Sequence, residues 1–382
     1  MGTPEGMERN RHIRSHAGLR GVAALLVVAY HLQFGGAYHL AIEDATPLFR
    51  RCYLFVDLFF VLSGFILCYI NDAERRDILS AGQYRRFMRR RLIRLYPLLF
   101  CTLVFMVAER ALHTIAFESS GHLVWIDWSG ASLAILASQF VLLNAWNPGP
   151  AGWNVPSWSI SAEMVAYLLF PLIVGAWLRW PKATRTALAL LAAGFYASVL
   201  AGDGSLDIIG GVAPLRCLAG FGLGMLLYSA RWHIAHVPDT WLSLLQLACG
   251  AGIVIVLASS IPDPVAMPFF AGIVLATWTD RGILARLLGA RVPVWLGEIS
   301  YSIYLTHVCL IEVIDTVWRG PAIEDAIGSD PARIGLIAAC YALVLLVSHW
   351  TFTYVEVPSR NWLGRRLLHA RVGPIENSPP AP

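Results

Sequence analysis

The chain has 382 residues, of which 57% are hydrophobic and 14% are charged, and its mean hydropathy is +0.59. Soluble domains average roughly 45–50% apolar and about 25% charged residues. The composition therefore excludes a disordered chain, a nucleic-acid-binding module and most soluble enzymes. The apolar runs are long and continuous, which predicts membrane-spanning helices rather than the alternating strands of an outer-membrane barrel.

These runs predict an all-α, polytopic membrane helix bundle with about ten transmembrane helices. We expect one integral-membrane domain over residues 1–360 and a cytoplasmic tail over 361–382, disordered at its Pro-rich end. The predicted crossings lie at about 17–38, 52–71, 95–117, 158–178, 186–203, 211–230, 240–258, 265–280, 295–317 and 334–355.

The basic residues predict the orientation of the chain, because Lys and Arg gather in short cytoplasmic loops. With both termini in the cytoplasm, 22 of the 29 basic residues fall in cytoplasmic segments and four fall outside. Residues 130–147 are apolar enough to cross, but a crossing there would move the later basic loops to the outside. We therefore expect this segment to be re-entrant or to lie on the outer surface, bracketed by tryptophans of a membrane interface.

Ionisable residues inside membrane spans are costly and mark candidate functional sites. Arg20 and His31 are eleven residues apart, so they share a helical face at a separation of about 16 Å along the axis. Asp57, in the next predicted span, lies at a similar depth to His31 and is expected to orient its imidazole. Glu163 also lies near the outer surface, so His31, Asp57 and Glu163 are the predicted catalytic residues. The alternatives are a packing histidine, a structural ion pair and a solvated carboxylate.

Two further groups of polar residues need an explanation. Ser300, Tyr304 and His307 fall on one face of a predicted span, which must then face the bundle interior or a cavity. Hydrogen bonding between helices is the alternative. Arg91 and Arg94 end the most basic segment of the chain, and arginine forks suit phosphates. Contact with anionic lipid is the alternative for these arginines.

The polar residues stand in motifs that follow one another along the chain: Gly18-Leu19-Arg20 with His31, Asp57-Leu58-Phe59-Phe60-Val61-Leu62-Ser63-Gly64-Phe65, Arg91-x-x-Arg94, Trp158-Ser159-Ile160-Ser161-Ala162-Glu163, Gly297-x-x-Ser300-Tyr301-Ser302-x-Tyr304-Leu305-x-His307 and Glu356-x-Pro358. In this order they resemble the membrane acyltransferase-3 family over roughly residues 12–360. One departure precedes the first motif, where the family more often has an acidic residue and this chain has His16 and Ala17.

The resemblance implies acyl transfer from cytoplasmic acyl-CoA, with acetyl as the expected group, to a hydroxyl, often on a cell-envelope glycan. It also implies that Arg20 and His31 are essential and that Arg91 and Arg94 serve the donor. A general base is needed because an alcohol is a poor nucleophile at neutral pH. Histidine suits this task, so His31 is the predicted base and His307 the second choice.

We expect the donor at Arg20, Arg91 and Arg94 on the cytoplasmic side, and the acceptor from the outside. The predicted substrate-binding residues are Trp158, Ser161, Tyr301, Tyr304 and His307. The expected partners are acyl-CoA, a hydroxyl acceptor and the lipid bilayer of the cell inner membrane, with no metal and no nucleic acid; a homo-oligomer is left open. The competing class is a transporter or exporter without catalysis, because intramembrane His, Asp and Glu can relay protons.

Overall fold

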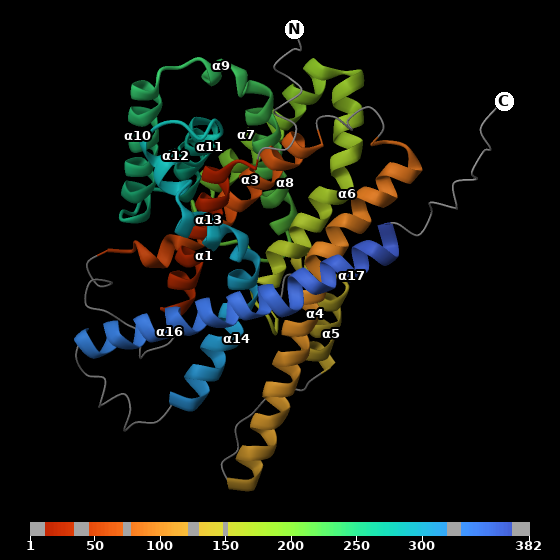
Figure 1. Cartoon of the computed structure of the whole chain (residues 1–382), viewed down its shortest axis with the longest axis vertical. Helices are drawn as coiled ribbons and strands as arrows, with labels where there is room; N and C mark the ends of the chain where they lie inside the picture. The colour runs from red at the N-terminus through yellow and green to blue at the C-terminus, as the bar shows by residue number, and fades with distance from the viewer. Residues whose placement is uncertain are drawn as a thin grey trace, which may run out of the picture.

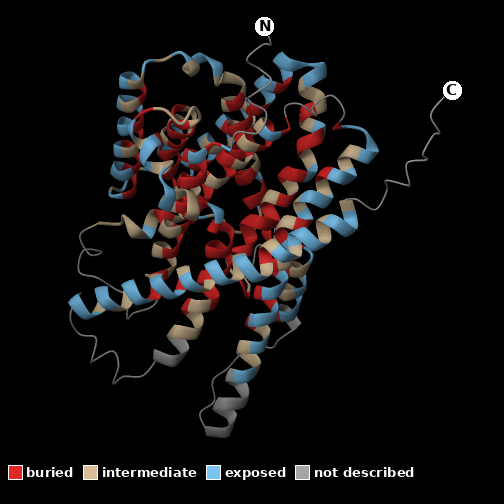
Figure 2. Ribbon diagram, viewed as in Figure 1, coloured by how far each residue is buried: buried red, intermediate tan, exposed pale blue. Residues whose placement is uncertain are grey.

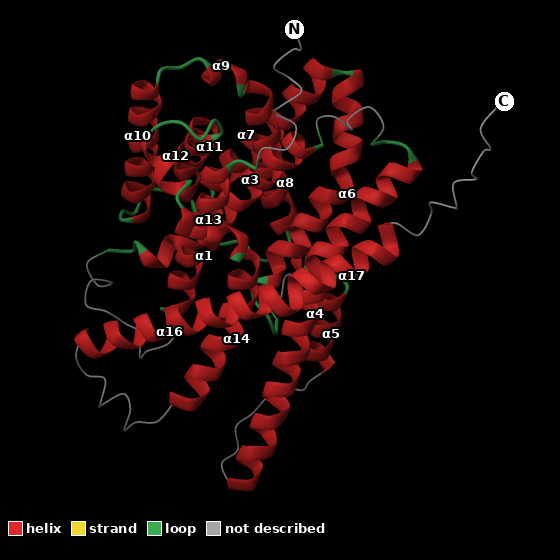
Figure 3. Ribbon diagram, in the orientation of Figure 1, coloured by secondary structure: helices red, strands yellow, loops and turns green. Residues whose placement is uncertain are grey.

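The structure, a computed structural model, describes residues 12–33, 46–71, 78–120, 130–147, 152–318 and 330–368, with no side-chain description at 113–120, 130–131 and 315–318. The described residues form helices and connecting loops and contain no strand (Figure 3). The end of the predicted tail, beyond Leu368, lies outside the described residues. The elements are α1 (Arg14–Leu32), η3 (Phe49–Leu54), α3 (Phe55–Ile70), α4 (Ala81–Ser120), α5 (Gly130–Phe140), η5 (Asn144–Trp146), α6 (Ser157–Arg179), α7 (Pro181–Ala201), α8 (Ala213–Ala230), α9 (Trp232–Ala235), α10 (Asp239–Leu257), η6 (Asp263–Val265), α11 (Ala266–Thr277), α12 (Ile283–Leu288), α13 (Arg291–Glu298), α14 (Ser300–Trp318), α16 (Asp330–Thr351), η7 (Phe352–Glu356) and α17 (Val357–Leu368).

The all-helical membrane bundle is confirmed for the described residues, and each of the ten predicted crossings contains a helix. Within the described residues, seven helices are long and apolar enough to cross a membrane, or eight if α13 and α14, bent by 67° at their junction, form one span. The helix α1 is not among them because Arg20 and two histidines interrupt its apolar sequence, and α11 is too short. The structure therefore supports seven to eight of the ten predicted spans.

The ambiguous segment 130–147 forms the 11-residue helix α5 followed by the short turn η5. At 1.5 Å per residue α5 is about 16 Å long, roughly half the hydrocarbon core of a bilayer. The segment is held by the chain around it, because the Tyr96 hydroxyl donates to the Phe140 carbonyl at 2.6 Å. The helix α5 is thus too short to cross the membrane by itself, which agrees with the expectation from the loop charges.

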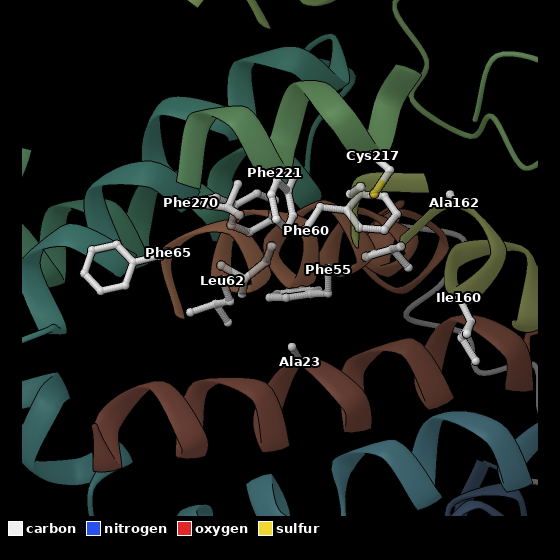
Figure 4. Close-up of a cluster of buried hydrophobic side chains, with 14 of the residues drawn as sticks. Ala23, Phe55, Phe60, Leu62, Phe65, Ile160, Ala162, Cys217, Phe221 and Phe270 are labelled. Carbon is white, nitrogen blue, oxygen red and sulfur yellow. The ribbon is translucent and has the colours of Figure 1, made fainter. Parts of the chain in front are cut away.

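Buried side chains gather at the centre of the bundle, whereas outward helix faces remain exposed (Figure 2). Aromatic residues of α3 contribute to this core: Phe60 lies near Phe221 of α8, and Phe65 lies farther along α3 (Figure 4). Large apolar side chains are exposed on the outer faces of α4 and α16, such as Phe105 and Leu346. An exposed apolar belt around a packed core is the pattern expected of helices that face lipid.

Helices α3 and α8 cross at glycines, which lets their backbones approach closely. A methyl group on Gly64 of α3 would lie 2.0 Å from the Phe221 carbonyl oxygen. A methyl group on Gly224 of α8 would lie 2.0 Å from the Val61 carbonyl oxygen. This close crossing fixes the side chains of α3 that line the site.

Helix α17 lies against the basic first part of α4, where the Arg89 guanidinium donates to the Leu367 carbonyl at 3.3 Å (Figure 1). The exposed arginines of α4 include Arg85, Arg86, Arg89 and Arg90. Arg91 instead turns inward and is half-buried. The helix therefore carries basic residues both on its surface and toward the bundle interior.

Candidate active site

A cavity lies among α1, α3, α4, α6 and α14 and contains about 780 Å³ of empty space, counted out to its opening. Its charged lining residues, among those that the structure describes, are Arg20 of α1, Arg91 and Arg94 of α4 and Glu163 of α6. The other lining residues are Val56, Phe59, Phe60, Leu62, Ser63, Ile66, Leu67, Leu95, Ser159, Ile160, Tyr167, Ser300, Tyr301 and Tyr304. The cavity thus brings together the three arginines that the sequence assigned to the donor.

The arginines are held from different sides. The Arg20 guanidinium donates to the Ser300 hydroxyl at 3.2 Å. The Arg91 guanidinium carbon lies 5.7 Å from the ring centres of Phe87 and Tyr167, and its Nε is buried without a hydrogen-bond partner among the described residues. Buried guanidinium groups need compensating anions or hydrogen bonds. Positive charge facing a cavity therefore points to a bound anion.

The sequence led us to expect Glu163 at a depth similar to that of His31. Glu163 lines the cavity together with the arginines, whereas His31 is not among the lining residues. The Glu163 carboxylate accepts a hydrogen bond from the Ser63 hydroxyl of α3. A second carboxylate, Glu356 of η7, contacts α14, where it accepts a hydrogen bond from the Ser302 hydroxyl at 3.1 Å. Three guanidinium groups against these two carboxylates leave the region with a positive charge.

The prediction that Asp57 orients His31 is wrong. The Asp57 carboxylate accepts from Arg216 of α8, from Nε at 3.0 Å and from Nη2 at 2.7 Å. Both side chains are buried, and the Trp158 ring lies over the guanidinium at 5.1 Å. The depth of Asp57 along α3 was matched to that of His31, but depth does not determine the direction in which a side chain leaves its helix. Asp57 therefore forms a structural ion pair with Arg216. Trp158, a predicted substrate-binding residue, instead covers the guanidinium of that pair.

His31 instead meets His307 of α14. His31 Nδ1 and His307 Nε2 are 3.1 Å apart, and the ring centres are separated by 4.7 Å. The pair lies next to the cavity: Tyr304 lines the cavity, and its ring centre is 6.0 Å from that of His307. Arg20 and His31 thus use the same face of α1, toward α14, as their spacing predicts.

The remaining predicted substrate-binding residues divide into two groups. Tyr301 and Tyr304 line the cavity, the first donating to the Leu95 carbonyl and the second bonded to the Ser159 hydroxyl at 2.7 Å. Ser161 is buried away from the cavity, where it donates to the Leu142 carbonyl at 2.7 Å and accepts from the Ala145 N–H at 3.1 Å. Its contacts fasten the turn after α5 to α6.

The sequence analysis missed three residues that shape the site. Arg216 carried a signal, because a charged residue inside an apolar span needs a buried partner. Ser63 stands in a motif, but its position alone assigns it no role. Tyr167, which lines the cavity between Arg91 and Glu163, carried no signal that separates it from an ordinary core tyrosine. Among the described residues, no group of three or more His, Cys, Asp or Glu side chains could hold a metal ion.

A helical membrane bundle with a basic internal cavity and an adjacent histidine pair defines a class of integral-membrane enzymes rather than a soluble transferase. A family model described as an acyltransferase domain matches residues 16–355. The chain therefore belongs to the membrane acyltransferase-3 family, and it is a multi-pass membrane acyltransferase that moves groups other than aminoacyl groups.

Individual relatives support this assignment. The acyltransferase MdmB of Streptomyces mycarofaciens is 28% identical over 92% of each chain. The peptidoglycan O-acetyltransferase OatA of Listeria monocytogenes is 23% identical over 92% of this chain and 56% of its own length. Nodulation protein 10 of Rhizobium leguminosarum is 26% identical over 69% of this chain and 74% of its own length. No solved structure is significantly similar to the chain.

Proposed function

We propose that the chain is an O-acyltransferase of the cell inner membrane that takes an acetyl group from cytoplasmic acetyl-CoA. The acceptor is a hydroxyl of a cell-envelope glycan or of a similar extracytoplasmic molecule. The observation that carries this proposal is the surplus of guanidinium groups in the cavity, one of which, Arg20, lies on the α1 face that also carries His31. The glycan class rests on the relative named as a peptidoglycan O-acetyltransferase.

The phosphates of the donor match the charge of the cavity. Arg20, Arg91 and Arg94 can each donate two hydrogen bonds to a phosphate, and such charge-assisted bonds are stronger than neutral ones. The thin, uncharged pantetheine arm then extends from the cavity toward His31, which lies about 16 Å along α1 from Arg20. Anchoring the charged end keeps the phosphates out of the hydrocarbon, where an unpaired charge would be costly.

The reaction needs one base and no change in oxidation state. The acceptor oxygen attacks the thioester carbonyl while His31 removes the hydroxyl proton. The new C–O ester bond forms as the C–S bond breaks. The thiolate of CoA leaves with the electron pair of that bond and receives the proton from His31. The products are the O-acyl acceptor and free CoA thiol, and His31 returns to its neutral form.

The test of the donor site uses purified protein and a matched pair of double variants. Arg91→Ala with Arg94→Ala removes two cavity cations, whereas Arg85→Ala with Arg86→Ala removes two exposed cations of the same helix. Two lost charge-assisted contacts should raise the Kd for acetyl-CoA by about 10²-fold or more. The exposed pair should leave it within about threefold. Lysine at 91 and 94 should restore binding only in part, since a point charge lacks the fork.

The reaction itself is tested by following the thiol of CoA and radioactive acetyl transfer to isolated envelope glycan. We expect thiol release that depends on the acceptor and is abolished by His31→Ala. Equal Kd values for acetyl-CoA in the two double variants would show that Arg91 and Arg94 only anchor the helix at the membrane surface. Movement of acetyl-CoA or glycan across proteoliposomes without thiol release would contradict the proposal and favour a transporter.

A further inference from the structure

The contact between His31 and His307 joins two helices that are far apart in the sequence. Nδ1 of His31 lies 3.1 Å from Nε2 of His307, and the rings meet edge to face at an angle of 69°. His307 is fully buried, and His31 is partly buried. Two imidazoles at this distance can share a hydrogen only if one nitrogen carries it and the other accepts it.

The backbone around the pair determines which nitrogen carries the hydrogen. Nδ1 of His307 lies 3.0 Å from the Ile303 carbonyl oxygen, which can only accept. This nitrogen must therefore be protonated, and Nε2 of the neutral ring is left as an acceptor. Nδ1 of His31 faces a second acceptor, the Val27 carbonyl oxygen, at 2.9 Å. Both neighbours of that nitrogen accept hydrogen bonds, so His31 must carry its proton on Nδ1.

We propose that His307 is a positioning residue that, together with the Val27 carbonyl, holds His31 in the Nδ1-protonated tautomer, so that Nε2 of His31 is the basic atom. The proposal rests on the proposed function, in which His31 removes the hydroxyl proton of the acceptor. It assigns the proton to one atom, and it gives His307 a role different from substrate binding.

The same contact stabilises the charged intermediate state of His31. When Nε2 takes the acceptor proton, the ring becomes an imidazolium with both nitrogens protonated. Its Nδ1–H still points to two acceptors, His307 Nε2 and the Val27 carbonyl, which favour the positive charge. The proton on Nε2 then passes to the leaving thiolate. His307 neither gains nor loses a proton in this cycle.

The geometry argues against His307 as the base itself. Its Nδ1 is protonated and bound to the Ile303 carbonyl, and its Nε2 is occupied by His31. With both nitrogens of His307 engaged, its ring has no free lone pair for the hydroxyl proton of an acceptor.

The kinetic test compares three variants in purified protein at saturating acceptor. His307→Met removes the acceptor nitrogen at similar size, whereas His307→Gln supplies an amide oxygen that can accept from Nδ1–H of His31. His233, an exposed histidine whose Nδ1 lies 2.9 Å from the Ala230 carbonyl oxygen, provides the control variant His233→Met. We expect His307→Met to lower kcat by roughly 10- to 10²-fold with an unchanged KM for the donor. His307→Gln should recover most of kcat, and the control should match wild type.

A spectroscopic test reads the tautomer directly and needs no turnover. Protein with ¹⁵N-labelled histidine is reconstituted in lipid, and the signals of His31 are identified by their loss in His31→Gln. We expect a protonated Nδ1 and an unprotonated Nε2 in the wild type, and part of the opposite tautomer in His307→Met. His31 protonated at Nε2 in active wild-type protein would overturn the role of His307, as would equal loss of kcat in the Gln and Met variants. Wild-type protein that transfers no acyl group would instead overturn the proposed function.

Discussion

Replacing Asp57 with Ala should destabilise the protein rather than alter its proton transfer. The side chain is fully buried, and its two bonds to Arg216 measure 3.0 and 2.7 Å. Removing the carboxylate would leave a buried guanidinium unpaired, which costs about 3–5 kcal/mol. Domains are commonly stable by about 5–15 kcal/mol, so this loss is a large fraction of the total.

The assay is thermal unfolding of the detergent-purified protein, followed by tryptophan fluorescence. The signal averages over 14 tryptophans, so it reports the unfolding of the protein as a whole. We expect the unfolding temperature of Asp57→Ala to fall by several degrees. The exposed Asp203, which accepts from the Ser205 N–H at 3.0 Å, provides the control, and Asp203→Ala should cost less than about 0.5 kcal/mol.

A double replacement separates the ion pair from the site. Asp57→Leu together with Arg216→Met exchanges the pair for apolar side chains, and such exchanges are often neutral or stabilising. We expect this double variant to regain most of the lost stability and to retain donor binding. An Asp57→Ala protein that unfolds at the wild-type temperature but has a shifted pH profile of kcat would refute the reasoning. That result would return Asp57 to the role of orienting His31.

Three further predictions concern packing and topology. Gly64→Ala should lower the unfolding temperature because its methyl group meets the Phe221 carbonyl, whereas Gly194→Ala, with open space around it, should be neutral or stabilising by about 0.4–1 kcal/mol. Ser161→Ala should cost about 1–3 kcal/mol of stability with an unchanged donor KM; a raised KM at normal stability would instead support substrate binding. Cysteines introduced in loop 281–294 should react with impermeant reagents only from the cytoplasmic side; labelling from outside in intact cells would contradict the predicted topology.

Much of the fold could be predicted from the sequence because apolar runs long enough to span a membrane have few alternatives to a helix. Part of the site could be predicted for a similar reason. Polar residues that recur on one helical face must point inward, and Ser300, Tyr304 and His307 are all buried in the structure. The spacing of Arg20 and His31 likewise placed both toward the same neighbouring helix.

The pairing of helices could not be predicted in the same way. Asp57 and His31 have similar depths, but the side chain of Asp57 leaves α3 toward α8, where the glycine crossing brings Arg216 close. Consecutive residues of a helix point in directions about 100° apart. The depth of a residue in the membrane carries no information on this angle. Counting charges would have helped, because Arg216 is the only basic residue of its predicted span, 211–230, and Asp57 is a buried carboxylate of the neighbouring helix.

The contacts between α1 and α14 also bear on the topology without any reference to loop charge. Arg20 contacts Ser300, and His31 contacts His307, so the two helices run in the same direction. The pairs are eleven residues apart on α1 and seven apart on α14, a difference of about 6 Å at 1.5 Å per residue, which the long Arg20 side chain spans. Two parallel spans need an even difference in their order along the chain. If all ten predicted crossings span the membrane, with α1 in the first and α14 in the ninth, the two helices are parallel. An added crossing at 130–147 would make α14 the tenth and reverse it. With that number of spans, the direction of α14 agrees with the placement of 130–147 on one side of the membrane, by an argument that does not use the basic residues.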